Sequence, residues 1–181
     1  MKTLLLLHSD LLESGREKFY RELEENLEVL RKVIGVDSLY ASVSSHFRDV
    51  FDRFPEVCLI NSLRDGSVFA AYRGLRKLRG DDVLLLDGGL KVTRELLHRF
   101  FGKIHVTVGT VRDRWAGIAL VKMRDLNYVI KSMERNFENT ILDAFYTLRD
   151  TYSVATEFVQ LKDAPDLQTA ESKPLYGEST G

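Results

Sequence analysis

The stretch 81–97 constrains the fold most strongly, because a short apolar run leads directly into a carboxylate and a glycine turn. Val83–Leu86 is continuously apolar, which is typical of a central strand in a sheet covered on both faces. Asp87 and two glycines follow at once. Ligands of open α/β sheets bind at the carboxyl ends of the strands, so Asp87 is predicted to face a binding crevice. Turn preferences alone fit equally well with an aspartate that only starts a turn before a helix at Thr93.

Short apolar runs alternate with amphipathic segments over the first hundred residues. The predicted strands are Thr3–Leu7, Leu39–Val43, Val57–Ile60 and Val83–Leu86. Apolar residues at helical spacing predict a helix that ends at Gly35, a short helix that Pro55 terminates, and a helix that opens at Gly66 and Ser67. Strands that alternate with helices in units of this size predict a parallel sheet with right-handed crossovers and helices on both faces.

The pattern changes in the last third of the chain. Residues 104–111 are rich in β-branched side chains and 116–121 are apolar again, which predicts an added antiparallel strand pair. Two helical faces over 126–133 and 141–148 and a last strand within 154–161 complete the prediction. We therefore expect a three-layer α/β domain over residues 1–167, with a mostly parallel central sheet. Residues 168–181 are polar, so we expect a loose, flexible tail.

Composition narrows the range of partners and compartments. The chain has 181 residues, 44% of them hydrophobic, which favours one domain. A net charge of −1 argues against a nucleic-acid partner. The single cysteine, Cys58, lies in an apolar run and is predicted to be a small buried hydrophobe rather than a reactive thiol. No apolar run reaches membrane-spanning length and Leu4–Leu7 is too short for a signal peptide, so we expect a soluble cytoplasmic protein without a membrane partner.

Several segments, taken in order, resemble one superfamily. They are Arg64-Asp65-Gly66-Ser67-Val68 with Gly74-Leu75, Leu84–Asp87 followed by Thr93-Arg94-Glu95-Leu96-Leu97, and Asp163-Ala164-Pro165-Asp166-Leu167. The chain thereby resembles the nucleotidyltransferases built on a single Rossmann-like domain. These include molybdenum-cofactor guanylyltransferase, methylerythritol-phosphate cytidylyltransferase and the sugar-phosphate nucleotidyltransferases. The resemblance covers most of residues 1–171.

This resemblance implies a function and a set of site residues. The implied reaction transfers a nucleoside monophosphate from a nucleoside triphosphate to a small phosphorylated acceptor, with release of pyrophosphate. The implied roles are Mg²⁺ binding by Asp87 and Asp163, triphosphate neutralisation by the catalytic residues Arg16 and Lys18, and substrate binding by Arg64, Ser67, Arg112 and Arg114. The base, the acceptor and the oligomeric state stay open, a homodimer included.

Simpler interpretations stand beside three of these roles. Ser67 precedes an apolar helical run, and we favour a helix N-cap there. Arg112 and Arg114, with Trp115, equally fit a solvated hairpin tip. The four histidines are too far apart in sequence to form a metal site by spacing, and we interpret them as structural.

The first loop departs from the family pattern. In the family, a glycine-rich loop after the first strand cradles the triphosphate with backbone N–H groups. Here residues 8–15 contain one glycine, Gly15, and two acids, Asp10 and Glu13. The alternative function is therefore a non-catalytic member of this fold with a nucleotide-binding, regulatory or structural role.

Two other chemistries at the first loop are disfavoured. A triad of His8, Ser9 and Asp10 is unfavourable because adjacent residues at a strand end alternate in direction. A phosphate-processing enzyme with Asp10 as nucleophile would need an Asp-x-Asp sequence, which is not present.

Overall fold

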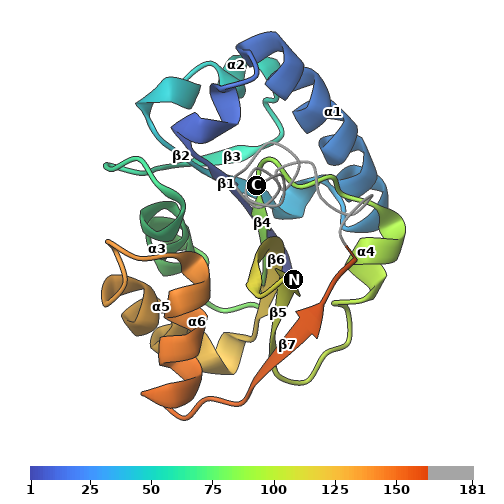
Figure 1. The fold of residues 1–181 in the computed structure, drawn as a ribbon. Coiled ribbons are helices and arrows are strands. Elements are labelled where there is room, and N and C mark those ends of the chain that lie inside the picture. Colours follow the sequence, from blue (N-terminus) through green and yellow to red (C-terminus); the bar gives the residue numbers. More distant parts are fainter. Residues whose placement is uncertain (163–181) are drawn as a thin grey trace, which may run out of the picture.

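A central seven-stranded sheet organises the chain, seen in a computed structural model that describes residues 1–162. The strands are β1 (Lys2–Leu7), β2 (Leu39–Val43), β3 (Cys58–Asn61), β4 (Val83–Asp87), β5 (Val106–Val111), β6 (Arg114–Val121) and β7 (Thr156–Gln160). Their spatial order is β3-β2-β1-β4-β6-β5-β7 (Figure 1). β1, β2, β3 and β4 are parallel, β6 is antiparallel to both β4 and β5, and β7 is parallel to β5. The predicted mostly parallel sheet with an added antiparallel pair is confirmed.

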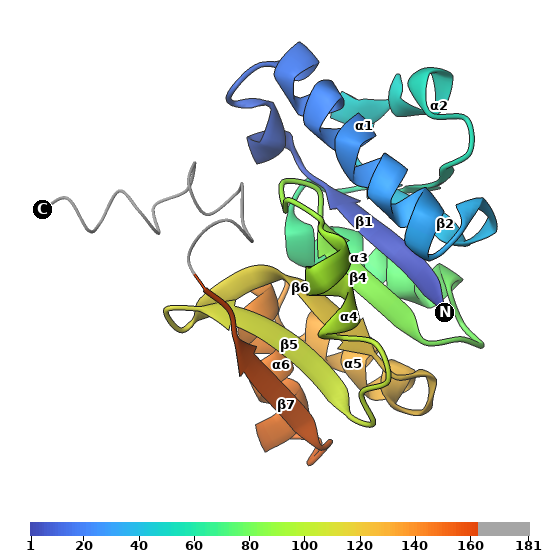
Figure 2. The same ribbon diagram turned by 90° about the vertical axis from the view of Figure 1, so that its right-hand side faces the viewer.

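Helices cover both faces of this sheet, as Figures 1 and 2 show. They are α1 (Arg16–Val33), α2 (Val50–Arg53), α3 (Ser67–Lys77), α4 (Arg94–His98), α5 (Leu126–Glu134) and α6 (Ile141–Asp150), with 3₁₀ turns η1 (Ser9–Leu12), η2 (Val36–Ser38), η3 (Ser45–Phe47) and η4 (Met123–Asp125). One buried core joins α1, α2 and α4 to the sheet, and a second joins α3, α5 and α6 to the opposite face. The arrangement is the expected three-layer α/β domain.

The crossovers place a switch point between β1 and β4. The chain leaves β1 through α1 on one face to reach β2, whereas it leaves β3 through α3 on the opposite face to reach β4. Neighbouring parallel strands whose crossovers pass on opposite faces leave a crevice at their carboxyl ends, where ligands of such sheets bind. A binding site is therefore expected at the carboxyl ends of β1 and β4.

Two local expectations were wrong. Cys58 is exposed rather than buried, because β3 is an edge strand and lacks a neighbour on its outer side. The N-cap of α3 is Gly66, with a φ of 119°, and Ser67 is the first helical residue. By contrast, the helix expected at Thr93 does begin there, since the Thr93 side chain accepts a hydrogen bond from the Leu96 N–H.

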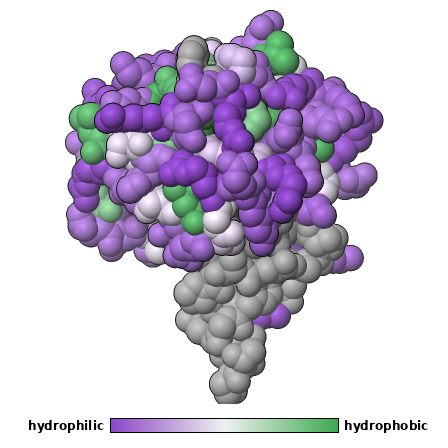
Figure 3. Space-filling view, turned by 90° about the horizontal axis from the view of Figure 1, so that it is seen from above, coloured by the Kyte–Doolittle hydropathy of each residue, from purple (hydrophilic) through white to green (hydrophobic). Residues whose placement is uncertain are grey.

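The described surface offers no evident membrane segment. Within residues 1–162, no helix is both long and apolar enough to cross a bilayer. The face in Figure 3 is mostly hydrophilic, with small separate hydrophobic areas. Scattered apolar side chains of this kind are ordinary on protein surfaces.

Close packing of α3 against β1 generates a stability prediction. A Cβ at Gly74 would lie 2.3 Å from Leu4 Cδ2 and 2.8 Å from Leu4 Cδ1, and Leu4 is fully buried. Gly74→Ala should therefore destabilise the fold by about 1–3 kcal/mol through overpacking, although alanine is the better helix former. Urea unfolding monitored by circular dichroism measures this loss.

A double-mutant cycle identifies the cause. Leu4→Ala alone should cost about 2–5 kcal/mol through the cavity it leaves, and the double variant should cost at least about 1 kcal/mol less than the sum of the two single changes. Strict additivity would contradict the packing explanation.

Candidate functional site

A buried histidine–aspartate pair lies at the carboxyl ends of β1 and β4. Asp87 is the last residue of β4 and is level with Leu6 of β1. His8 is two residues beyond Leu6, so its side chain points to the same face of the sheet. His8 Nε2 and Asp87 Oδ1 are 2.7 Å apart, and the two residues are only 7% and 5% exposed. The predicted aspartate is thus held by a direct hydrogen bond with the residue that follows the first strand.

Two glycines fix the position of Asp87. The Gly88 N–H donates to Leu6 O at 2.9 Å, and a Cβ at Gly88 would lie 2.5 Å from Leu7 Cδ2. Gly117, on β6, has a φ of 90°, and a Cβ there would lie 3.3 Å from Asp87 Cβ. The backbone therefore approaches Asp87 from both neighbouring strands, which leaves its carboxyl group little freedom to move.

Four backbone N–H groups of the first loop donate hydrogen bonds to other groups of the protein. The N–H groups of Leu11, Glu13 and Gly15 each donate to the carbonyl three residues earlier, at 3.0–3.2 Å. The Ser9 N–H donates to Asp65 Oδ1 at 3.0 Å. In this conformation these four amides are engaged by the protein itself, whereas a triphosphate cradle would present such amides toward the crevice.

Three carboxylates surround the end of β1. Besides Asp87, Asp10 Oδ2 lies 3.8 Å from His8 Nδ1, and Asp65 accepts hydrogen bonds from both the N–H and the hydroxyl of Ser9. The sequence argument against a triad of adjacent residues agrees with this geometry, because the Ser9 hydroxyl donates to Asp65 while His8 bonds Asp87. The crevice is therefore locally acidic, with His8 between two of the acids.

The two predicted phosphate-binding cations contact protein groups. Arg16 donates to the His46 carbonyl at 2.8 Å and to Asp49 Oδ1 at 3.2 Å. Lys18 lies 3.9 Å from Glu22, one turn along α1. Both side chains are about half exposed, and the contacts of Arg16 use only its Nη1 atom.

The other predicted substrate residues lie at the start of α3 and at the turn between β5 and β6. Ser67 begins α3, and nearby Arg64 pairs with Glu138 at 2.9 Å and lies over the Phe69 ring, 5.3 Å from its centroid. Arg112 is in the two-residue turn between β5 and β6, and Arg114 begins β6. Since β6 is antiparallel to β4, this turn lies at the same end of the sheet as Asp87.

The described residues supply one of the two predicted metal ligands. Asp163 lies outside them, as does the domain boundary predicted at residue 167. Within residues 1–162, no group of three or more acidic, histidine or cysteine side chains could hold a metal ion. Mg²⁺ is commonly held by one or two carboxylates together with substrate phosphates and waters. Asp87 is the predicted ligand that the structure describes, and its Oδ1 lies 2.7 Å from His8 Nε2 while its Oδ2 accepts a hydrogen bond from the Gly89 N–H at 3.3 Å.

His8 lies beside the first loop, as its sequence position indicates, but its contact with Asp87 was not predicted, since the histidines were interpreted as structural. It directly follows the apolar strand β1. Because successive side chains of a strand point to opposite faces, His8 lies on the same face as Leu4 and Leu6. This alternation places His8 on the face of Leu6, but only the pairing of β1 with β4 shows that Asp87 shares that face. The sequence spacing of the histidines tests only for metal sites, and it does not reveal the contact of His8 with Asp87.

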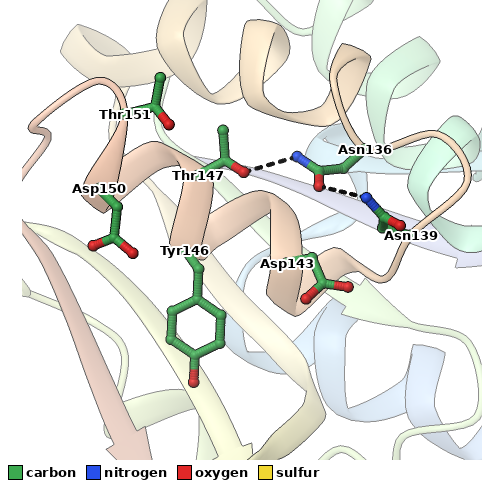
Figure 4. A pocket seen from close by; sticks show the side chains of 7 residues that line it. All are labelled: Asn136, Asn139, Asp143, Tyr146, Thr147, Asp150 and Thr151. Atoms are coloured by element: carbon green, nitrogen blue, oxygen red, sulfur yellow. Dashed lines mark hydrogen bonds between the residues drawn. The ribbon is translucent and has the colours of Figure 1, made fainter.

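A hollow lies along α6 (Figure 4). Its amides and hydroxyls bind one another: Asn136 Nδ2 donates to Thr147 Oγ1, and Asn139 Nδ2 donates to Asn136 Oδ1, both at 3.0 Å. Asp143, which also lines it, is used in the capping box with Thr140. These bonds explain the hollow as local helix and loop structure.

The pair of Ser9 and Asp65 generates a pH prediction. Burial alone would raise the pKa of Asp65, but the hydrogen bonds from the Ser9 hydroxyl and N–H, with the nearby charges of His46 and His8, outweigh it and leave the pKa below the ordinary value of an aspartate. The pKa of Asp65 is therefore lower in the folded protein than in the unfolded chain. The contribution of this pair to the stability of the fold is complete above about pH 4 and is lost as the pH falls through the folded pKa.

Ser9→Ala should therefore raise the pKa of Asp65 and lower the stability at neutral pH, with a difference from wild type that shrinks in acid. NMR titration of the Asp65 carboxyl carbon and urea unfolding at several pH values measure the two effects. Ser14→Ala, at an exposed position of the same loop, is the matched control. An unchanged Asp65 titration in Ser9→Ala would refute the assignment.

Comparison with known proteins supports the fold expected from sequence. The chain has a TM-score of 0.69 at 12% identity to 4-diphosphocytidyl-2C-methyl-D-erythritol synthase from Anaerococcus prevotii, covering 99% of this chain and 96% of that one. The bifunctional IspDF of Campylobacter jejuni gives 0.72 at 13% identity over 95% and 53% of the two chains. Molybdopterin-guanine dinucleotide biosynthesis protein A from Archaeoglobus fulgidus gives 0.60 at 13% identity over 99% and 88%.

These solved structures include nucleotidyltransferases, so the predicted resemblance is confirmed at the level of the fold. No protein-family model and no curated protein sequence matches the chain. Identities of 12–13% support a shared fold and leave the chemistry to be argued from the site.

Proposed function

We propose that the chain transfers a nucleoside monophosphate from a nucleoside triphosphate to a small phosphorylated acceptor in the crevice between β1 and β4. The observation that carries this proposal is the buried Asp87 carboxylate, held by His8 at the switch point of a sheet whose fold is shared with nucleotidyltransferases. A fixed carboxylate at this point is suited to a cation that accompanies phosphates.

The proposed chemistry needs positioning and charge neutralisation rather than a covalent intermediate. Mg²⁺, when bound, would neutralise phosphate charge. Asp87 would ligate it, and His8, with its hydrogen bond to Oδ1, would keep the carboxylate oriented. Arg16 and Lys18 would contact the outer phosphates.

The two sides of the crevice would then divide the substrates. Arg64 and Ser67, at the start of α3, would contact the base or ribose. Arg112 and Arg114, at the turn between β5 and β6, would contact the phosphorylated acceptor. This division follows from their places on opposite sides of Asp87.

A specific observation favours a second candidate, a non-catalytic protein of the same fold that binds a nucleotide or serves a regulatory role. The N–H groups of Ser9, Leu11, Glu13 and Gly15 are all donated within the protein, and the Asp65 carboxylate occupies the position of an anion at Ser9. Triphosphate binding must therefore either rearrange this loop or proceed without it.

Calorimetric titration with each of the four nucleoside triphosphates in Mg²⁺ tests the site. We expect weak binding in the high micromolar range, about −5 to −6 kcal/mol, because the loop amides are not preorganised. Asp87→Asn should weaken the Mg²⁺-dependent part at least about tenfold, or about 1.4 kcal/mol. Asp37→Asn, at an exposed acid in η2 near the amino end of β2, is the matched control and should bind as wild type does.

Release of pyrophosphate decides between the two candidates. Wild-type protein that binds a triphosphate and releases pyrophosphate when a sugar or alcohol phosphate is added would support the transferase, provided that Asp87→Asn abolishes the release. Binding without any release across a panel of acceptors would support the non-catalytic candidate. Absence of triphosphate binding would overturn the transferase proposal.

A further inference from the structure

A groove of about 390 Å³ lies between the edge strand β3 and α3, away from the crevice. Its floor includes Cys58 and Ile60 of β3 and Tyr40 of β2, and α3 contributes Arg73 and Lys77 to its wall. Tyr40 and Cys58 are register partners near the amino ends of their strands. The groove exists because β3 has no neighbour on its outer side and α3 leaves this strip of the sheet uncovered.

The charges that line the groove are all positive. Arg73 and Lys77 are four residues apart on α3 and so project from the same side of the helix. The lining residues include no aspartate or glutamate. Two like charges at this spacing repel each other, so the free groove holds an unfavourable arrangement that an anion would relieve.

The Arg73 side chain has a buried N–H donor without an acceptor within residues 1–162. Its Nε atom is buried, and no group among the described residues accepts a hydrogen bond from it. Nearly all buried polar atoms in folded proteins have a partner, because leaving one unmade is costly. Because Nε is inaccessible to solvent, a ligand in the open groove would contact the terminal nitrogens of the Arg73 guanidinium rather than Nε, and Arg73 contributes its positive charge to the groove.

The remaining lining residues suit an organic molecule that carries an anionic group. The Tyr40 hydroxyl and the Asn61 amide can add neutral hydrogen bonds, and Ile60 and Leu78 provide buried apolar surface. The volume falls in the range of ordinary small-molecule pockets. A phosphate monoester carries about −1.5 to −2 charges at pH 7, which matches two cations better than a single carboxylate does.

We propose that this groove is a second binding site, for a small phosphate monoester whose phosphate contacts Arg73 and Lys77. The site is independent of the proposed transferase crevice, since none of its lining residues belongs to that crevice. Its ligand would reach the protein from the open side of the sheet edge.

The single cysteine of the chain makes the proposal directly testable, because exposed Cys58 lies inside the groove. The rate at which neutral iodoacetamide alkylates Cys58 is followed by intact-protein mass spectrometry. Inorganic phosphate and glycerol phosphate are the probes, with sodium chloride and sodium acetate at matched ionic strength as controls. About 10 mM phosphate should slow the reaction about threefold, as expected for a dissociation constant of about 5 mM, and chloride should not.

Two substitutions on α3 locate the effect. Arg73→Gln should abolish the protection by phosphate. Arg76→Gln is the matched control, since the Arg76 guanidinium donates to the Tyr72 hydroxyl at 2.9 Å and does not line the groove; it should retain the protection. Asp87→Asn should also retain it, which separates this site from the crevice, and thermal melts establish that each variant is folded.

Each remaining outcome would overturn the proposal. Protection by chloride as strong as that by phosphate would show ionic screening. Protection by acetate as strong as that by phosphate would refute a phosphate site. Equal protection in folded Arg73→Gln would show that phosphate acts elsewhere.

Discussion

The parallel pairing of β1 with β4 is the interaction on which the rest of the site depends. It brings together two strands more than seventy residues apart in sequence, and it continues beyond the strands through the hydrogen bond from the Gly88 N–H to Leu6 O. Because β6 then pairs antiparallel to β4, Asp87 is enclosed by backbone on both sides. A Cβ at Gly88 would lie 2.5 Å from Leu7 Cδ2, and one at Gly117 would lie 3.3 Å from Asp87 Cβ. The sheet therefore sets the place of Asp87, while His8 and the Gly89 N–H contact its two carboxylate oxygens.

Most of the fold could be predicted because strand and helix signals are local. The continuous apolar run before Asp87 and the helical spacing over α1 depend only on which faces are buried, and both are visible in sequence. What sequence did not show is the order of strands in space. Cys58 illustrates this: an apolar run predicts a covered strand, but only the topology reveals that β3 is at the edge, where the thiol is exposed.

The site was less predictable, because its contacts join distant segments. His8 bonds a residue 79 positions away, and Ser9 bonds one 56 positions away. No pattern of spacing contains such pairs. The presence of Asp87 at a strand end could be inferred from its neighbours, whereas the Asp65 carboxylate on the Ser9 amide could not. The contacts of Arg16 with Asp49 and His46 could not be predicted either, since these two residues come from a different loop.

The balance of charge in the crevice bears on how a nucleotide could enter it. Asp10, Asp65 and Asp87 lie near the end of β1, while Arg16 and Lys18 are directed toward other acids. Like charges repel strongly where water is partly excluded, so a bare triphosphate meets an unfavourable field at this point. A divalent cation reverses that field, because it adds two positive charges beside Asp87. Nucleotide binding at this crevice is therefore expected to depend on the cation more strongly than in a relative whose glycine-rich loop supplies its own donors.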